Sequence, residues 1–178
     1  MIRSSVLSFV PVLSFMTLIG CGDSKNDPPP QREGARQRQE LSQRVRKGYS
    51  DLAKANGRFV EVLQPFLEMQ DGNRANLQRA FEDFRKSLKE TKEKTADLGT
   101  STVSDSQDLV EAFGKYLSVY EDNLAKGYAE IVDKLDKADR PPSVVLEISL
   151  LYLACNDPEK SARAALVKAI DSFDRRLE

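Results

Sequence analysis

Hydrophobic residues recur at alternating spacings of four and three along most of the chain after Ala35. They form three long series, over residues 45–66, 77–98 and 109–135, the last with one slip in its spacing. Such spacing places the apolar side chains on one stripe of an α-helix. No stretch combines sustained alternation with turn residues, as a strand would. The pattern therefore predicts three long helices, with ends near Asp71-Gly72-Asn73 and Gly99.

The last part of the chain reads as two shorter helical segments. Arg140-Pro141-Pro142 ends the third helix, because proline disfavours helical backbone in the residue before it. Residues 144–155 are apolar on nearly every side, so we expect them to be the most buried element. Asp157 and Pro158 suit the first positions of a further segment, whose stripe includes Leu166 and Ile170.

Length decides how these segments combine. Laid end to end, the last two segments are about as long as each of the other helices, at about 1.5 Å per residue. We therefore expect an all-α fold, an antiparallel four-helix bundle over residues 35–178. Its last helix would be kinked or broken near Pro158. The alternative is a separate short helix that folds across one end.

The chain begins with an apolar run of a different kind. Arg3 precedes residues 6–19, which are mostly Val, Leu, Phe, Met and Ile. This run is too short to cross about 30 Å of hydrocarbon as a helix, and it is typical of the hydrophobic region of a signal peptide. It ends in Leu18-Ile19-Gly20-Cys21, where an ordinary secretory leader has small residues around its cleavage site.

The Leu18–Cys21 stretch resembles the lipobox of bacterial lipoproteins, which has an aliphatic residue, a tolerant position, a small residue and a cysteine. The resemblance covers residues 1–21. It implies that the Cys21 thiol receives a diacylglyceryl group, that the chain is cut between Gly20 and Cys21, and that Cys21 becomes the acylated N-terminus. Residues 1–20 would then be a removed signal peptide.

Residues 21–34 would link the lipid to the domain. Gly22 to Gly34 contains three prolines and no residue that could enter a core, so we expect a lipidated flexible tether. The expected location is the bacterial cell envelope, extracytoplasmic and bound to the membrane through the covalent lipid. Gly22, where an aspartate would favour the inner membrane, is similar to the pattern of outer-membrane lipoproteins that face the periplasm.

The composition of the chain argues against several classes of function. The formal net charge is −1, and histidine is absent. The first observation argues against nucleic acid as a partner. The second removes the most common general base and metal ligand, so no metal site or other cofactor is expected. No nucleophile motif, phosphate loop or dinucleotide motif occurs, and we expect no enzyme activity. Cys155 follows an apolar run, which favours a packed core residue over an intermolecular disulfide.

Cations gather at the start of the first helix. They are Arg32, Arg36, Arg38, Arg44, Arg46 and Lys47, against only two acids nearby. A helix N-terminus prefers acidic residues, so local helix stability does not explain the cluster. One interpretation is binding to an anionic surface of the envelope. The other is a solvated face whose charges are balanced by acids from another helix.

The expected function follows from these observations. We expect a membrane-anchored envelope lipoprotein whose helical bundle acts in binding or scaffolding, with another envelope protein or an anionic surface as partner. The alternative is a carrier that holds a hydrophobic ligand in a crevice of the bundle. A continuous, packed core without a cavity favours scaffolding, and an open crevice near Tyr116 and Tyr120 favours a carrier.

Overall fold

The computed structural model describes residues 30–137 and 142–175, of which 30–32 and 142 are described by their backbone only. Within these ranges the chain is all-α and contains no strand. The elements in order are α1 (Pro30–Leu67), α2 (Arg74–Lys94), a short 3₁₀-helix η1 (Ala96–Thr100), α3 (Gln107–Asp122), a π-helix η2 (Asn123–Gly127), α4 (Tyr128–Asp136) and α5 (Pro142–Asp174). None of the described helices has an apolar stretch long enough for a bilayer crossing.

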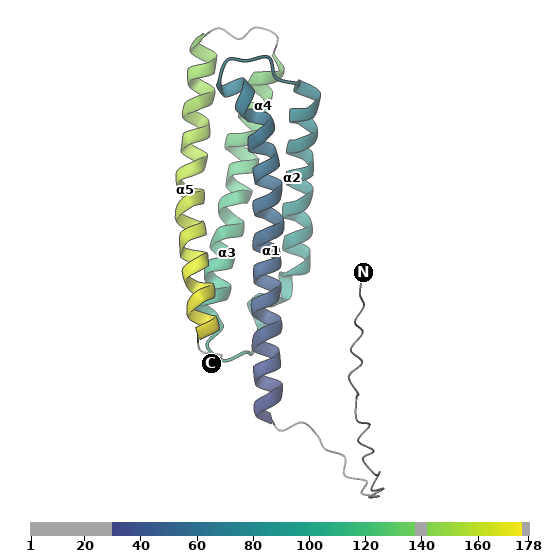
Figure 1. Cartoon of the computed structure of the whole chain (residues 1–178), viewed down its shortest axis with the longest axis vertical. Coiled ribbons are helices and arrows are strands. Elements are labelled where there is room, and N and C mark those ends of the chain that lie inside the picture. Colours follow the sequence, from purple (N-terminus) through teal and green to yellow (C-terminus); the bar gives the residue numbers. More distant parts are fainter. Residues whose placement is uncertain (1–29, 138–141, 176–178) are drawn as a thin grey trace, which may run out of the picture.

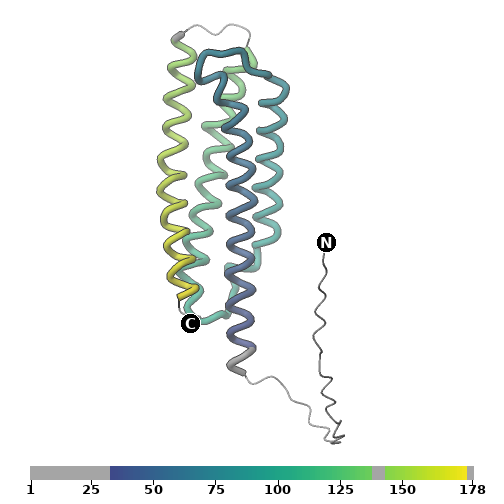
Figure 2. Tube along the Cα trace, in the orientation of Figure 1, coloured from purple at the N-terminus to yellow at the C-terminus, as the bar shows by residue number. Residues whose placement is uncertain are grey.

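The helices lie side by side along one long axis (Figures 1 and 2). α3, η2 and α4 follow one another in a single column, beside α1, α2 and α5 (Figure 1). The most extensive contacts join α1 to α2 and α3 to α5. The start of α1 extends past the other helices at the end where the chain terminates, and the start of α5 lies at the opposite end (Figure 1).

The core sits on the predicted stripes. The buried side chains from the three series are Val45, Leu52, Phe59, Leu63, Phe66, Leu77, Phe81, Phe84, Leu88, Leu98, Leu109, Phe113, Tyr116, Tyr120, Leu124, Ile131 and Leu135. α5 adds Ile148, Leu166, Ile170 and Phe173 on its inner side. The predicted helical periodicity is therefore confirmed, since a spacing of four and three places these residues along one face of each helix.

Two predicted boundaries differ from the structure. α1 begins at Pro30 instead of Ala35, because proline is well suited to the first helical position and the following charged residues favour helix. α2 ends at Lys94, before Gly99, because the chain tightens into η1. The separation at residues 71–73 is confirmed, and the Asn73 side chain caps α2 by accepting a hydrogen bond from the backbone N–H of Asn76 at 2.9 Å.

The last two predicted segments form one helix. The sequence predicts a kink or a break near Pro158. α5 runs without interruption through Pro158, so the break is absent, and the alternative of a short helix across one end is wrong. Proline removes the hydrogen bond to the carbonyl four residues earlier, that of Ala154. Ala154 and Pro158 both lie on the exposed side of α5. Water can satisfy the Ala154 carbonyl there, and the helix tolerates the proline.

The first half of α5 is not the most buried element, which corrects a second expectation. Leu146, Leu150 and Leu153 are 63%, 59% and 53% exposed, although Ile148 and Cys155 on the opposite side are buried. A helix that is apolar on every side gives no signal of which side the rest of the fold covers. In this structure the other helices cover one side only.

The slip in the third hydrophobic series coincides with the π-helix η2. Two consecutive spacings of four, from Tyr116 to Tyr120 and on to Leu124, require one extra residue, and a π-turn accommodates it. The turn brings the column against α5, where the Asn123 side chain donates a hydrogen bond to the Cys155 carbonyl at 2.9 Å. Gly127 fits because a Cβ atom there would lie 2.1 Å from Cys155 Sγ.

This contact predicts a coupling between Gly127 and Cys155. Gly127→Ala should lower the free energy of unfolding by about 1–3 kcal/mol, because the added methyl group overpacks the contact. In the Cys155→Ala background the loss should be smaller, since the sulfur is gone and the next atom, the Cβ of residue 155, lies 3.9 Å away. Urea unfolding followed by circular dichroism measures both.

Gly114→Ala is the matched control. A Cβ at this α3 position meets no atom within 4 Å, so the change should stabilise the protein by about 0.5–1 kcal/mol through backbone entropy. Strictly additive effects of Gly127→Ala and Cys155→Ala would contradict the packing that we describe.

Candidate functional site

The sites predicted from the sequence fall into two groups. Gly20 and Cys21, with the rest of the signal peptide and most of the tether, lie outside the described residues. The basic segment is described from Arg36 onward, and the side chain of Arg32 is outside the described part.

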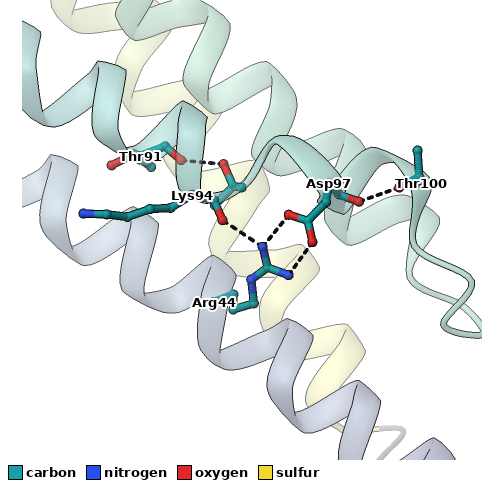
Figure 3. A network of polar contacts seen from close by, with 6 residues as sticks. Arg44, Thr91, Lys94, Asp97 and Thr100 are labelled. Carbon is teal, nitrogen blue, oxygen red and sulfur yellow. Dashed lines mark hydrogen bonds and ion pairs between the residues drawn. The ribbon is translucent and has the colours of Figure 1, made fainter.

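Arg44 joins α1 to the end of α2 (Figure 3). Its guanidinium donates to both carboxylate oxygens of Asp97 in η1, at 2.9 and 2.5 Å, and to the backbone carbonyl of Lys94 at 2.7 Å. The planar fork of arginine suits this two-oxygen contact, and the carbonyl is one that the end of α2 leaves free. The Asp97 carbonyl accepts the Thr100 hydroxyl at 2.8 Å, so the same contact holds the whole 3₁₀ turn.

Two other arginines of the basic segment also reach distant elements. Arg46 forms an ion pair with Asp174 near the end of α5, and the other oxygen of that carboxylate accepts the Ser42 hydroxyl at 2.6 Å. The Arg38 guanidinium lies over the Phe173 ring, 5.1 Å from its centre, and its Nη1 is 3.9 Å from a carboxylate oxygen of Asp105. Arginine therefore connects α1 to η1, to the turn before α3 and to α5.

The remaining two cations pair within α1. Arg36 contacts Glu40 at 2.9 Å and Lys47 contacts Asp51 at 3.1 Å, each one helical turn along, and the Arg36 and Lys47 side chains are 73% and 71% exposed. Every basic side chain from Arg36 to Lys47 thus has an acid within ion-pair distance. Balancing by acids of other elements gives the cluster a structural reason.

The ion pairs with arginine change the pKa of the acids that take part in them. The hydrogen bond from Arg44 holds the pKa of Asp97 below its ordinary value. Partial burial would raise the pKa of Asp174, but the hydrogen bonds from Ser42 and Arg46 outweigh burial and lower it. Both carboxylates therefore stay ionised further into acid in the folded protein than in the unfolded chain.

A second polar site, which sequence reasoning missed, lies inside the helical domain. The Glu159 side chain on α5 points inward, and the residue is only 9% exposed. Its Oε1 accepts hydrogen bonds from the Asn56 side chain and the Tyr120 hydroxyl, each at 2.8 Å, and its Oε2 accepts the Tyr128 hydroxyl at 3.4 Å. The Tyr116 hydroxyl donates to that of Tyr120 at 3.2 Å. We call these five residues the Glu159 cluster.

Burial dominates the electrostatics of the cluster. It raises the pKa of the Tyr116, Tyr120 and Tyr128 hydroxyls well above the ordinary value, and the nearby Glu159 carboxylate adds to the effect. Burial, followed by the charge of Glu159, also raises the pKa of the Cys155 thiol to about 11. A thiol with a raised pKa is a poor nucleophile, so the arrangement favours a packed Cys155 over a reactive one.

The geometry of the cluster indicates a structural role. Buried carboxylates are tolerated when donors satisfy their lone pairs, and here donors from α1, α3 and α4 converge on α5. The Oδ1 atom of Asn56 is the one buried atom of the cluster without a hydrogen bond in the described part of the chain. Within that part, no group of three or more Asp, Glu, Cys or His residues is placed to hold a metal ion.

One feature of the sequence does indicate the Glu159 cluster. Glu159 follows Cys155 by four residues and precedes Leu166 by seven, so it occupies a core position of the α5 stripe. A charged residue at such a position predicts a buried partner. The run of charged neighbours around residue 159 obscured this signal.

A groove lies between α2 and the column of α3, η2 and α4. Its volume is about 550 Å³, and its apolar lining includes Phe81, Leu88 and Leu124. Arg85, Lys89 and Lys92 contribute its cations, and an ion pair of 2.7 Å between Lys92 and Glu121 crosses it. The groove is open to solvent, unlike the Glu159 cluster.

Comparison of the chain with protein-family models, with curated proteins and with solved structures gave no match.

The arginine contacts predict a specific acid dependence. Because the folded-state pKa values of Asp97 and Asp174 are lowered, their contribution to stability is present above the unfolded pKa of about 4 and is lost as the pH falls through the folded values. Asp97→Asn and Asp174→Asn should therefore each destabilise the protein near pH 7 and flatten the loss of stability below about pH 4.

Urea midpoints measured from about pH 6 down to about pH 3 test this dependence. Asp171→Asn is the control, because Asp171 is an exposed α5 carboxylate without an ion pair among the described residues. An acid profile of Asp97→Asn identical to that of the unsubstituted protein would show that the Arg44 contact does not stabilise the fold.

Proposed function

We propose that this protein is a lipid-anchored envelope lipoprotein whose helices form an antiparallel four-helix bundle that binds or scaffolds other molecules and carries out no catalysis. The anchor would be the diacylglyceryl and acyl lipid on Cys21, after removal of residues 1–20. The location would be the extracytoplasmic side of a bacterial membrane, and Gly22 favours the periplasmic face of the outer membrane.

The contacts between elements support the bundle. α1 packs against α2 and α5, α3 packs against α5, and α2 packs against α4. The connection from α1 to α2 and the start of α5 lie at one end of the domain, whereas η1 lies near the other end (Figure 1). Short connections at alternating ends are what an up-and-down arrangement requires.

The observation that carries the binding role is the closed centre of the domain. The carrier alternative places its crevice beside Tyr116 and Tyr120, and these residues are 0% and 1% exposed. Their hydroxyls are used within the Glu159 cluster, so they have no free donor for a ligand. Contacts with other molecules would then be made on the outer surface.

The groove between α2 and the α3–α4 column favours the carrier alternative. Its apolar lining residues and its cations, among them Arg85 and Lys89, would suit an acyl chain with an anionic head group. The groove is open to solvent, however, and a carrier generally encloses most of its ligand. We therefore keep the carrier as the second candidate.

Fewer cations are available to contact an anionic surface than the sequence suggested. Arg44 and Arg46 are held by acids of other elements, and Arg38 packs over the Phe173 ring, so a partner would have to compete with those contacts. Arg36 and Lys47 stay largely exposed, and their pairs within α1 are weak ones. These two residues, together with Arg32, are the cations that we propose for such a contact.

Fatty-acid labelling tests the anchor. Cys21→Ser should abolish incorporation of labelled fatty acid and should accumulate the uncleaved precursor, because a hydroxyl cannot form the thioether. Mass spectrometry of the membrane-extracted protein under native conditions distinguishes the two roles. Binding or scaffolding predicts the mass of the processed, acylated chain, and a carrier predicts an additional bound molecule. Undiminished labelling of Cys21→Ser would refute the anchor.

A further inference from the structure

The outer side of α5 carries a continuous apolar surface that the fold leaves uncovered. Leu146, Leu150 and Leu153 are each more than half exposed, and their spacing of four and three places them on one face of the helix. We call them the α5 leucine stripe. Single exposed leucines are ordinary, but adjacent ones on one face mark an interaction site.

The charge around the α5 leucine stripe limits what can cover it. The charged side chain beside it, Glu147, is already bound to Lys134 of α4 at 2.8 Å. Ala154 extends the surface on the same face and is also exposed. Between Leu146 and Leu153 the stripe therefore offers no unpaired charge to a polar partner, and the complement of this part is another apolar stripe.

We infer that the α5 leucine stripe packs against the same stripe of a second copy of this chain, with the two α5 helices antiparallel about a two-fold axis near Leu150. A two-fold interface brings identical surfaces together, so an uncharged apolar stripe is complementary to itself. The inference rests on the proposed binding role and names its partner.

Charge favours the antiparallel arrangement. Asp157 and Ser143 each lie seven residues from Leu150, about 10 Å along the helix in opposite directions. An antiparallel pair therefore places Asp157 of one copy beside the first turn of α5 in the other, and that turn contains no acidic residue. Asp157 is exposed and forms no ion pair with the described residues. A carboxylate beside the positive end of a helix is favourable.

A parallel pair lacks this contact. It would place Asp157 of one copy opposite Asp157 of the other, so that two like charges face each other where the stripe ends.

The antiparallel pair is also compatible with anchoring of both copies. The first half of α5 lies at the end of the molecule opposite the start of α1 (Figure 1). A two-fold axis perpendicular to a membrane would hold both α1 helices at the same height above it.

Disulfide cross-linking of the full chain in whole cells tests the inference. After mild oxidation, Leu150→Cys should give a product of twice the chain mass on non-reducing gels. Ser143→Cys and Asp157→Cys should cross-link when the two variants are expressed together, and much less when either is expressed alone. Adding Leu150→Glu to that pair should reduce the product at least about tenfold, because two buried charges would oppose each other.

Met69→Cys is the matched control. Met69 is an apolar residue that is 74% exposed in the connection between α1 and α2 and is not part of the α5 leucine stripe. The unsubstituted chain reports any background from its own cysteines, and circular dichroism of each purified variant shows that it is folded. Cross-linking in whole cells does not require lipidation, so loss of the anchor and loss of self-association give separate results.

Three results would overturn the inference. Equal products from Met69→Cys and Leu150→Cys would indicate random collision. A Leu150→Cys product of another mass would show that a different protein covers the stripe, and the binding role would then stand without self-association. Absence of any Leu150→Cys product would show that no second copy packs on this face.

Discussion

The Glu159 carboxylate lies inside the helical domain without a cation at ion-pair distance among the described residues, and it is satisfied by neutral donors alone. Those donors come from α1, α3 and α4, so three helices must keep a fixed height and rotation relative to α5. A shift of any of them by one residue would remove one of the donors that satisfy the buried carboxylate, at a cost of about 1–3 kcal/mol. This requirement specifies one packing where apolar stripes alone would permit several.

Other features of the domain follow from the same constraint. The π-helix η2 lies between Tyr120 and Tyr128 and allows both hydroxyls to face Glu159, although the two residues are separated by eight positions. The turn also presses Gly127 against Cys155 on the helix that carries the carboxylate. Because the Tyr116 and Tyr120 hydroxyls donate within the Glu159 cluster, they have no free donor for a ligand. We therefore propose that other molecules contact the surface of the domain, above all the exposed side of α5.

The sequence predicted much of this fold and little of its polar interior. Spacing of four and three identified the helices and their buried faces, because burial of a stripe is what that pattern records. It could not tell which side of α5 is covered, since Leu146 and Ile148 are equally apolar and only the neighbouring helices distinguish them. Pro158 suggested a break, but an exposed proline leaves its unpaired carbonyl in contact with water. The partners of Arg44 and Arg46 lie at least fifty residues away along the chain, beyond the reach of local patterns.

Urea unfolding of two Glu159 variants tests the central role of this residue most directly. Glu159→Ala should lower the free energy of unfolding by about 3–5 kcal/mol, because it leaves buried donors on three helices without an acceptor. Glu159→Gln should cost less, since its amide oxygen still accepts hydrogen bonds. Asp171→Ala, an exposed acid on the same helix, should change stability by no more than about 0.5 kcal/mol. A loss for Glu159→Ala no larger than that for Asp171→Ala would contradict the account.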